Sequence, residues 1–567
     1  MIKILLSDDE GNIWVSINEN GLRKINIKTN EIITYRHDKN DKYSIQSNCS
    51  NEILQDKNGI IWIGTEKGLS KYIKNEDKFI TYRSKNYDSS SLSDDTVYSM
   101  IEDSNGFIWV GTYIGVSIFD PNNQIKKYKS DPINKNSLSD NVIHGIYEDN
   151  DGLIWVGTKD KGINIIDRKS DKYTHIKEGS SEYDLSDNII KDIEGKDNIV
   201  WVATRNGLNE IDKSTMKIKK YTTDDGLVSN RIASVFVDSK GYLWIGTEDG
   251  VNILNTKNKE IIDITPLLKA NGVKDTYIYE IYETKSGHYL MGSFIIGELI
   301  DINPVNKTIK KHIYYNDEGS YTRMYSIRSI IEDNNQNVWI GTNYGLLRYN
   351  IETRKSESYT EKDGLANNTV YGILLDDYDN PWISTNNGIS KLNIKTNKFR
   401  NISNIDGLQS NEFNLSAYYK CRDGEFLFGG VNGLNSFYPD DISEESSSPV
   451  VTFDRFEIGS RSYKDIDNLS FDYNENVIKI KFFIPEYQNN NIQYQYKLEG
   501  SSNEWIKVNG NKVILNDLAP GKYTFKIKAM GQNGVLGDES SVTFIIKSPI
   551  WATKGAIFVY IIIILCI

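Results

Sequence analysis

Short runs in which apolar and polar residues alternate cover most of the chain, and they return at a fixed spacing. Val97–Glu102 alternates with the two-residue period of a strand, and a polar turn separates it from a second apolar run. The turn and the second run share the frame D-x-x-G-x-(I/L/V)-W-(V/I)-(G/A/S)-T-x-x-G-(L/V/I), which recurs every 43 to 49 residues. The Trp of this frame is present at Trp14, Trp62, Trp109, Trp155, Trp201, Trp244, Trp339 and Trp382. Two further copies carry Leu290 and Leu427 at that position, so the chain contains ten repeats.

Each repeat predicts four short strands, and a strand-rich repeat of this length indicates a propeller blade. In the third repeat the first strand is Val97–Glu102, and the glycine of the D-x-x-G turn reverses the chain into the strand that carries Trp109. Gly115–Phe119 and Ile125–Tyr128 supply the third strand and the outer strand. A polar connector, which ends in Ser-Asp-Asn or a variant of it, then returns the chain to the axis.

The repeated Trp is predicted to fill the wedge between neighbouring blades, while the small residue two positions later lets the next sheet approach. The alternative is that the Trp rings form platforms on which sugars stack. The acidic turns are predicted to be solvated hairpin turns. Asp149-Asn150-Asp151-Gly152 is similar to the start of a calcium loop, but no Glu stands at the twelfth position.

Beyond the repeats, residues 439–449 have the composition of a linker, and alternating strands continue without the repeat. About a hundred residues of such strands predict an Ig-like β-sandwich. The predicted strands are Val450–Phe456, Val477–Ile484, Ile492–Leu498, Val513–Leu515, Lys522–Met530 and Ser541–Ile546.

The last residues, 555–567, are apolar without interruption and follow Pro549-Ile550-Trp551, which is typical of an interfacial anchor. Thirteen residues are fewer than the roughly 20 that a helix needs to cross a bilayer. We therefore expect residues 553–567 to be the start of a transmembrane helix, in a sequence that is cut at both ends. The alternative is a buried C-terminal strand or helix.

The ten copies resemble the two-component regulator propeller repeat, over residues 1 to about 440. The segment Tyr494–Gly500, followed by Trp505 and Leu518–Phe525, resembles the three-tyrosine (Y_Y_Y) domain. The resemblance implies the sensor ectodomain of a membrane-bound bacterial signalling protein, such as a hybrid histidine kinase. It also implies that the sandwich joins the propeller to the membrane.

The family's usual arrangement is two seven-bladed propellers, which implies fourteen repeats where this chain has ten. We expect an all-β chain with three blades of a partial propeller (residues 1–130), a seven-bladed propeller (131–440), a linker (441–449), the sandwich (450–548) and the truncated helix (553–567). The tenth repeat lacks a fourth strand, so its open edge is predicted to take Ile125–Tyr128, which would close the ring. A single ten-bladed ring is the alternative.

Composition and charge exclude some partners and suggest no enzyme chemistry. A formal charge of -12, without a basic stripe, argues against nucleic acid and against an anionic membrane surface as the main partner. The three cysteines are far apart and predict neither a disulfide framework nor a metal site. No catalytic motif is present, and none of the five His residues stands at metal-ligand spacing. We expect no cofactor.

Binding is the expected activity, because the connectors and the T-x-x-G loops of a propeller open on one face. Residues that recur in these loops are predicted to be architectural, and residues that break the pattern are candidates for specificity. Aromatic faces beside Arg, Asn and carboxylates suit sugar hydroxyls. The candidate ligand-binding residues are Arg205, Asn206, Arg231, Glu248, Asp249, Tyr321, Arg323, Asn343, Tyr344, Asn386 and Asn387.

The sequence therefore predicts the extracytoplasmic ligand-sensing region of a membrane-bound two-component receptor. It would bind a small molecule or an oligosaccharide, act as a homodimer, and pass the signal through the sandwich to the membrane helix. Residues 1–548 would lie outside the cytoplasm. A glycan-active propeller enzyme, either a lyase or a hydrolase, is one alternative, and a surface adhesin is another. The enzyme would require a buried carboxylate, His or Tyr pair near the axis with a perturbed pKa.

Overall fold

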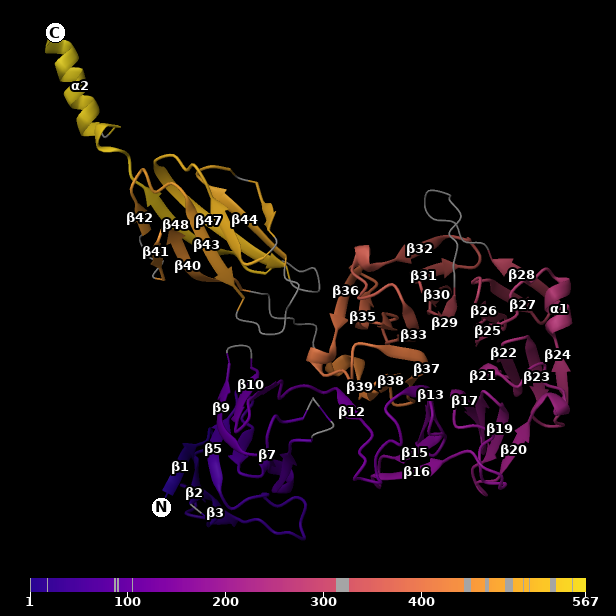
Figure 1. The fold of residues 1–567 in the computed structure, drawn as a ribbon. Coiled ribbons are helices and arrows are strands. Elements are labelled where there is room, and N and C mark those ends of the chain that lie inside the picture. The colour runs from indigo at the N-terminus through magenta and orange to yellow at the C-terminus, as the bar shows by residue number, and fades with distance from the viewer. Residues whose placement is uncertain are drawn as a thin grey trace. The chain divides into compact units, whose positions relative to one another are not determined.

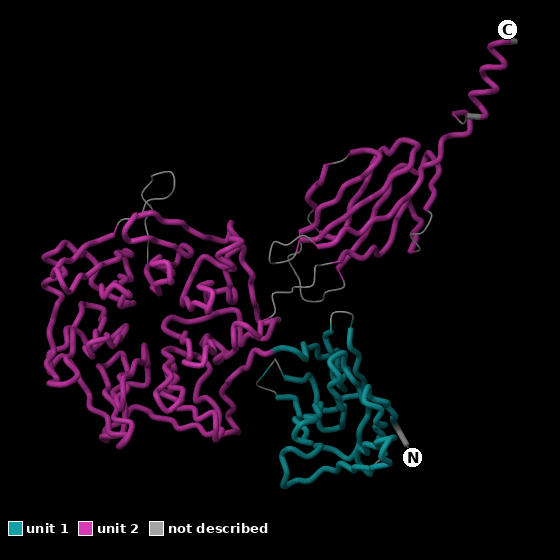
Figure 2. Tube along the Cα trace, turned by 180° about the vertical axis from the view of Figure 1, so that it is seen from behind, with its two compact units in different colours: residues 1–123 teal, residues 124–567 magenta. Residues whose placement is uncertain are grey.

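The computed structural model describes residues 2–566 except 18, 86–87, 89–90, 104–105, 313–325, 443–449, 465–468, 485–492, 503, 509, 531–536 and 553. The chain is all-β, and its described residues contain strands β1 to β48 and the short helices α1 and α2 (Figure 1). It divides into two compact units, Met1–Asn123 and Gln124–Ile567 (Figure 2).

The first unit contains three antiparallel sheets in which consecutive strands are neighbours. The first two sheets have four strands each and the third has three. They comprise β1 (Ile2–Ser7), β2 (Asn12–Ile17), β3 (Gly21–Asn26) and β4 (Ile32–Tyr35); β5 (Ser50–Gln55), β6 (Ile61–Thr65), β7 (Gly68–Ile73) and β8 (Lys78–Tyr82); and β9 (Val97–Glu102), β10 (Ile108–Thr112) and β11 (Val116–Phe119).

The second unit begins with a ring of seven four-stranded sheets, which we call blades 4 to 10 after the repeats that form them (Figure 1). Blades 4 to 6 consist of β13 (Ile143–Glu148), β14 (Ile154–Thr158), β15 (Ile163–Asp167) and β16 (Lys172–Ile176); β17 (Ile190–Lys196), β18 (Ile199–Thr204), β19 (Gly207–Asp212) and β20 (Ile218–Tyr221); and β21 (Ile232–Val237), β22 (Tyr242–Thr247), β23 (Val251–Asn255) and β24 (Ile261–Asp263).

Blades 7 to 9 repeat the same antiparallel order of four consecutive strands. They consist of β25 (Ile278–Glu283), β26 (Tyr289–Ser293), β27 (Leu299–Asn303) and β28 (Thr308–His312); β29 (Ile327–Glu332), β30 (Asn337–Thr342), β31 (Gly345–Asn350) and β32 (Ser356–Tyr359); and β33 (Val370–Leu375), β34 (Pro381–Thr385), β35 (Gly388–Asn393) and β36 (Lys398–Ile402).

Blade 10 closes the ring with a strand taken from the start of the unit. Its sheet has the order β12-β39-β38-β37, in which β37 (Phe413–Lys420), β38 (Phe426–Gly430) and β39 (Gly433–Phe437) are consecutive. The fourth strand is β12 (Lys126–Tyr128), which pairs antiparallel with β39. The prediction that the segment before the fourth repeat fills this edge is therefore confirmed. Because β12 belongs to the ring, the first compact unit ends at Asn123.

The recurring residues of the connectors hold neighbouring blades together. The backbone N–H of Gly433 in blade 10 donates to the carbonyl of Asn141 at 2.7 Å, and Asn414 Nδ2 donates to the carbonyl of Ile143 at 3.1 Å. The equivalent bond runs from the backbone N–H of Gly207, in the T-x-x-G loop of blade 5, to the carbonyl of Asn230, the last connector residue before blade 6. The side chains have a role as well, because Asn141 Oδ1 accepts the backbone N–H of Ser130 at 2.8 Å and Asn230 Oδ1 accepts that of Thr223 at 2.8 Å, so these connector asparagines are architectural, as predicted.

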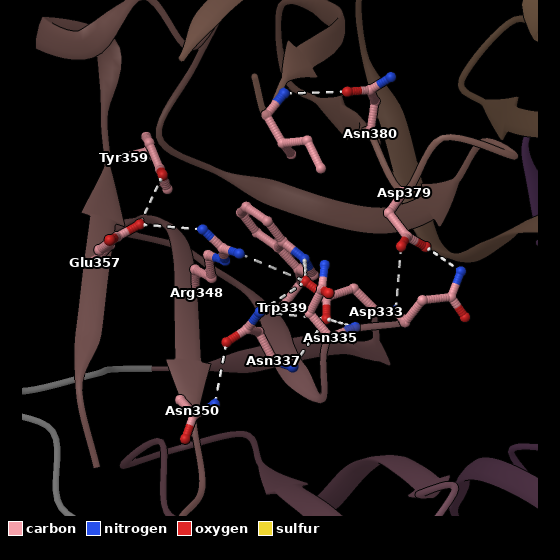
Figure 3. Close-up of polar contacts among 12 residues, drawn as sticks. Asp333, Asn335, Asn337, Trp339, Arg348, Asn350, Glu357, Tyr359, Asp379 and Asn380 are labelled. Carbon is pink, nitrogen blue, oxygen red and sulfur yellow. Dashed lines mark hydrogen bonds and ion pairs between the residues drawn. The ribbon is translucent and has the colours of Figure 1, made fainter. Parts of the chain in front are cut away.

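The repeated Trp lies in the core in seven of its eight positions, all except the half-buried Trp109. Its indole nitrogen has a partner that the sequence analysis did not foresee, the Asp of the D-x-x-G turn. In blade 8, Trp339 Nε1 donates to Asp333 Oδ2 at 3.2 Å (Figure 3). Asp333 Oδ1 also accepts the backbone N–H groups of Asn335 and Asn337, at 2.8 and 2.9 Å. One carboxylate therefore fixes both the turn and the ring.

This Asp–Trp hydrogen bond recurs wherever the frame has its Asp. The Nε1–Oδ2 distances are 2.8 Å for Trp14 and Asp8, 2.9 Å for Trp62 and Asp56, 2.8 Å for Trp109 and Asp103, 3.0 Å for Trp155 and Asp149, 3.0 Å for Trp244 and Asp238, and 3.1 Å for Trp382 and Asp376. The fifth repeat lacks the Asp, and there Trp201 Nε1 donates to Glu210 at 3.4 Å instead.

The insertion in the seventh repeat contains a helix that the sequence analysis did not predict. Helix α1 (Thr265–Ala270) has a Pro in its first turn, and Leu268 is fully buried among apolar residues of blades 6 and 7. The insertion therefore adds to the core between two blades.

After the ring, two sheets share one apolar core. All six predicted strands of this domain are present, and the short strands β41, β42 and β45 were not predicted. One sheet has the order β41 (Arg461–Tyr463), β40 (Thr452–Ile458), β43 (Ile478–Phe483) and β46 (Lys512–Leu515), and the other has the order β42 (Leu469–Phe471), β48 (Ser540–Ile546), β47 (Gly521–Met530), β44 (Gln493–Glu499) and β45 (Ile506–Val508).

The chain ends in helix α2 (Lys554–Cys566), whose apolar side chains are exposed, Ile563 to 49%. Among the described residues no helix has the length and apolarity needed to span a bilayer. That α2 is the start of a transmembrane helix stays a prediction.

Candidate functional site at one end of the ring axis

The first strand of every blade in the ring carries a β-bulge near its start. These strands pack against one another in sequence, and β13 packs against β37, so they form the innermost layer of the ring. A bulge re-aims a side chain and is common beside binding sites. The residues inside the seven register shifts include His144, Lys191, Ala233, Tyr279, Arg328, Tyr371 and Asn414.

The T-x-x-G loops lie at the same end of the blades as the bulges. In blade 5 the backbone N–H of Arg205, the first loop residue after the Thr, donates at 3.3 Å to the carbonyl of Ile189, which precedes β17. The equivalent bond joins Glu248 to Arg231 in blade 6 at 3.1 Å. We call this end of the ring, formed by the bulged residues, the residues before the first strands and the T-x-x-G loops, the axial end.

Nine of the eleven predicted site residues lie at the axial end, but two of them have structural roles. Asn206 Nδ2 donates to the carbonyl of Ser186 at 3.5 Å, and Asn387 Nδ2 donates to the carbonyl of Ala366 at 3.3 Å. Both side chains therefore tie their loop to the connector of the same blade.

The charged candidates come together on blades 5 and 6. Arg231 and Glu248 form an ion pair at 3.1 Å, in which the Arg231 side chain is 58% exposed. Burial raises the pKa of Tyr277 in blade 7. The charge of Glu248 raises this pKa further, and the charges of Arg205 and Arg231 lower it. Asp249 is exposed in the same loop as Glu248, and its backbone N–H donates to Thr247.

Of the candidates in blades 8 and 9, Asn386 contacts a bulged residue. Asn386 Oδ1 accepts a hydrogen bond from the Tyr371 hydroxyl at 2.8 Å, and the guanidinium of Arg328 stacks 5.0 Å from the centre of the Tyr371 ring. Asn343 Oδ1 is buried and has no hydrogen-bond partner among the described residues. Tyr344 is 62% exposed.

Tyr321 and Arg323 lie in 313–325, outside the described residues. Their predicted role stays a prediction.

The sequence analysis missed an aromatic cluster in blade 7. Ring centres lie 5.1 Å apart for Tyr277 and Phe294, 4.9 Å for Tyr279 and Phe294, and 6.1 Å for the two Tyr residues. Phe294 occupies the loop position that holds Arg205 in blade 5. A signal was available in the sequence, because the residue after the first apolar position of each first strand differs from repeat to repeat and is aromatic in blade 7.

Further along the first strands, three carboxylates were also missed. Burial raises the pKa of Asp192 to about 7 and that of Glu194 to about 8, and it raises the pKa of Glu280 well above its usual value. All three residues are half-buried in the inner layer of the ring. Glu280 Oε2 accepts a 3.2 Å hydrogen bond from the hydroxyl of Tyr418. No ion pair involves these acids among the described residues.

Among the described residues, Cys421, Asp423 and Glu425 in the turn of blade 10 lie close enough to one another to hold a metal ion. Glu425 is bound by Arg168, and Asp423 accepts from the Tyr438 hydroxyl at 2.9 Å. Burial raises the pKa of the Cys421 thiol to about 12, so the thiolate form that binds metals is disfavoured. Cys421 stands at the position of the Asp of the D-x-x-G turn, where its backbone N–H donates to the carbonyl of Glu425 at 2.8 Å.

A closed ring of strand-built blades followed by a two-sheet domain defines a β-propeller protein. Residues 44–67, 91–113, 137–160, 226–249 and 324–344 match the two component regulator propeller, and residues 486–547 match the Y_Y_Y domain. The chain carries two component regulator propeller repeats and a Y_Y_Y domain, the family that the repeat frame predicted.

Two similar proteins place this architecture in context. Histidine kinase P4 of Formosa agariphila is 28% identical over 396 residues, which make up 64% of this chain and 25% of that kinase. The match thus spans about a quarter of the length of the curated relative. The extracellular domain described for the hybrid two component system BT3049 of B. thetaiotaomicron has the same fold, with a TM-score of 0.68, 22% identity, and coverage of 96% of this chain and 78% of that one.

Proposed function

We propose that this chain is the extracytoplasmic sensing region of a membrane-bound two-component receptor. In this proposal the axial end of the ring binds a small molecule or an oligosaccharide, and the Y_Y_Y domain passes the signal to α2 and the membrane. The receptor acts as a homodimer, and its catalytic output lies in a separate kinase or signalling domain. The similarity to a histidine kinase and to the extracellular domain of a hybrid two component system supports this role.

The observation that carries the proposal is the contrast between a constant frame and a variable axial end. The Asp–Trp bond, the connector and the loop glycine repeat from blade to blade. The first loop residue, which follows a Thr in five blades, Ser293 in blade 7 and Gly430 in blade 10, is Lys159, Arg205, Glu248, Phe294, Asn343, Asn386 or Val431. Such variety has no architectural purpose, because one residue type would build all blades equally well. It is typical of a surface that recognises an asymmetric ligand.

A ligand at this surface can signal only if it binds two arrangements of the receptor with different affinity. The axial end is built by several blades, so a ligand that bridges them changes the balance between such arrangements.

The proposal is tested by thermal unfolding of the full chain in a mild detergent with a panel of oligosaccharides and metabolites. A specific ligand raises the melting temperature in proportion to the logarithm of its concentration above Kd. The shift is expected to be lost in Phe294→Ala and kept in Lys398→Ala, which changes an exposed residue of the outer strand β36. A shift that survives every substitution at the axial end would place the ligand elsewhere and contradict the proposal.

A glycan-active enzyme is the second candidate, because one specific observation favours it. Glu280 and Tyr418 form a hydrogen-bonded pair near the axis, and burial raises the pKa of both groups. A carboxyl group that stays protonated at neutral pH is suited to act as a general acid. This candidate predicts turnover of a glycan by the purified chain, abolished in Glu280→Gln. Binding without turnover supports the sensor instead.

A further inference from the structure

We infer that two copies of this chain pair through their first units, so that the three blades of each copy together form a closed six-bladed ring. In this dimer the third blade of each copy packs against the first blade of the other. The inference rests on the homodimer of the proposed function and names the surfaces that form it. It follows from two exposed apolar faces of the first unit, whose sheets we call blades 1 to 3 after their repeats.

Within the first unit, each blade packs one face against the opposite face of the next blade. Trp14 of blade 1 shares an apolar cluster with Phe79 of blade 2, and its ring centre lies 5.0 Å from that of Tyr72. Trp62 of blade 2 meets Phe119 of blade 3 in the same way, also at 5.0 Å. We call the face of a blade that carries the Trp its rear face, and the opposite face its front face.

The rear face of blade 3 is apolar and exposed. Ile101 and Ile118 stand opposite Trp109 on the two neighbouring strands, so they lie on the rear face, and both are exposed. Val116 lies on the same face and is 60% exposed, whereas the equivalent Leu69 of blade 2 is 1% exposed. Blade 3 therefore presents to solvent the positions that blade 2 buries against its neighbour.

The front face of blade 1 is exposed in the same manner. Leu5 occupies the position that Ile53 holds in blade 2, and it is 64% exposed where Ile53 is 4% exposed. Ile32 is also exposed, although the equivalent Phe79 is buried in blade 2. Contiguous exposed apolar side chains are typical of an interaction surface. The two exposed faces are thus the two halves of the contact that blades 1, 2 and 3 make with one another.

Blade 3 also retains a residue that admits a further blade. A Cβ at Gly64 of blade 2 would lie 2.6 Å from Val97 of blade 3, so this glycine lets the next sheet approach. Blade 3 keeps glycine at the equivalent Gly111, where the atoms nearest to a Cβ all belong to Ser99 of the same blade. The room for a following blade is therefore present on the rear face of blade 3.

A second copy supplies the blade that fits each exposed face. Blades 4 to 10 form a closed ring, so each of them already has a neighbour on both faces. Among the described residues, the front face left for blade 3 is that of blade 1, and three blades are too few to close on themselves. Two copies give six blades, within the typical range of about four to eight, whereas three copies would give nine. A twofold axis makes the two contacts identical.

The test measures the mass of the full chain in a mild detergent by analytical ultracentrifugation over a range of concentrations. We expect a dimer that dissociates on dilution. Val116→Asp on the rear face and Leu5→Lys on the front face should each raise the dissociation constant about a hundredfold or more, because each places a charge in both contacts. Both side chains are exposed in a single copy, so the variants should fold, which circular dichroism checks. Val305→Asp, in an exposed turn of blade 7, is the matched control and should dimerise as the unchanged chain does.

A mixture of the two variants tests whether the two faces pair with each other. A dimer of one Val116→Asp chain and one Leu5→Lys chain has one unchanged contact, and its other contact holds both substitutions, which are of opposite charge. We therefore expect mixed dimers at concentrations where each variant alone is monomeric. A dimer held by α2 or by the Y_Y_Y domain would instead withstand both single substitutions.

The inference is overturned if the chain is monomeric at every concentration, if the dimer withstands Val116→Asp and Leu5→Lys, or if the mixture does not recover the dimer. Assemblies larger than a dimer would contradict the closed six-bladed ring. None of these outcomes decides whether the axial end binds a ligand, which the thermal unfolding with the oligosaccharide and metabolite panel measures separately. Failure of the whole panel would reject the sensing role and leave the dimer standing.

Discussion

The hydroxyl of Tyr418 in blade 10 donates a 3.2 Å hydrogen bond to Glu280 in blade 7, although blades 8 and 9 separate their sheets along the ring. The two side chains therefore meet across the inner layer of the propeller. Gly372 in blade 9 makes room for this contact, because a Cβ there would lie 2.1 Å from Cδ1 of Tyr418. A specific hydrogen bond therefore joins two distant blades inside the ring, where the first strands converge.

Removal of the Tyr418 hydroxyl should destabilise the ring more at alkaline than at acidic pH. Tyr418→Phe leaves Glu280 without its donor, which should cost about 1–2 kcal/mol when the carboxyl is protonated and more when it is ionised. Chemical denaturation at pH 5 and pH 9 measures both values. An equal cost at the two pH values would show that Glu280 does not titrate in this range.

The buried acids predict a falling stability as pH rises. The folded pKa of Asp192, about 7, lies above the unfolded value of 3.8, so the folded chain binds more protons between these values. Stability is therefore lost as pH rises from about 4 to about 7, and the loss persists above that range. Asp192→Asn should remove the part of this dependence that Asp192 contributes and raise the free energy of unfolding at pH 8 by about 1–3 kcal/mol, while Glu194 and Glu280 keep their part. The control is Asp171→Asn, in an exposed turn, which should leave the slope unchanged.

The contribution of the Asp–Trp hydrogen bond to the free energy of unfolding can be measured by comparing Phe variants of two buried Trp residues. Trp339→Phe removes a 3.2 Å bond to the fully buried Asp333, whose Oδ2 keeps only the Asn337 side chain at 3.0 Å and Arg348 at 3.9 Å. Trp201→Phe removes a longer contact of 3.4 Å with Glu210, which keeps Tyr221 and Lys259 as partners. Both variants lose apolar volume, so the difference reports the hydrogen bond. We expect Trp339→Phe to be the more destabilising by about 1 kcal/mol. Equal losses in equilibrium unfolding would mean that the bond contributes nothing.

Gly372→Ala should destabilise the ring by about 1–3 kcal/mol, because the new Cβ collides with the Tyr418 ring. The collision can be isolated with a double-mutant cycle. In a Tyr418→Ala background the same Gly372→Ala change should cost far less, since the ring that it meets is gone. Additive effects of the two changes would contradict the contact.

Two truncated chains test the closure of the ring. Residues 124–567 keep β12, while residues 129–567 lack it and expose the edge of β39. The longer chain should retain the stability of the ring, and the shorter one should lose about 2–3 kcal/mol, because three residue pairs and the buried Ile125 are removed. Hydrogen exchange of the β39 amides measures the effect directly. Equal protection of these amides in both chains would mean that β12 does not hold the ring closed.

Most of the fold could be predicted from the sequence because each blade repeats the same local sequence pattern. The alternation of apolar and polar residues predicted the strands, and the turn glycine predicted the hairpin between them. Because the tenth repeat lacks a fourth strand, Ile125–Tyr128 could be predicted as the strand that closes the ring. Helix α1 was missed because the insertion around Leu268 is short and its burial depends on the two blades that flank it. The role of the turn Asp was missed because its bond to the Trp indole spans six residues and exists only after the hairpin has formed.

What the sequence by itself determined is therefore the blade, its number of copies and the order of domains, since these follow from local periodicity and from the composition of each segment. Only the tertiary structure decided which side chains meet at the axis. Arg231 and Glu248 pair across one blade although 17 residues separate them, and Glu280 and Tyr418 belong to different blades. Their proximity depends on the curvature of the whole ring, because every blade between two residues sets the angle at which they face each other.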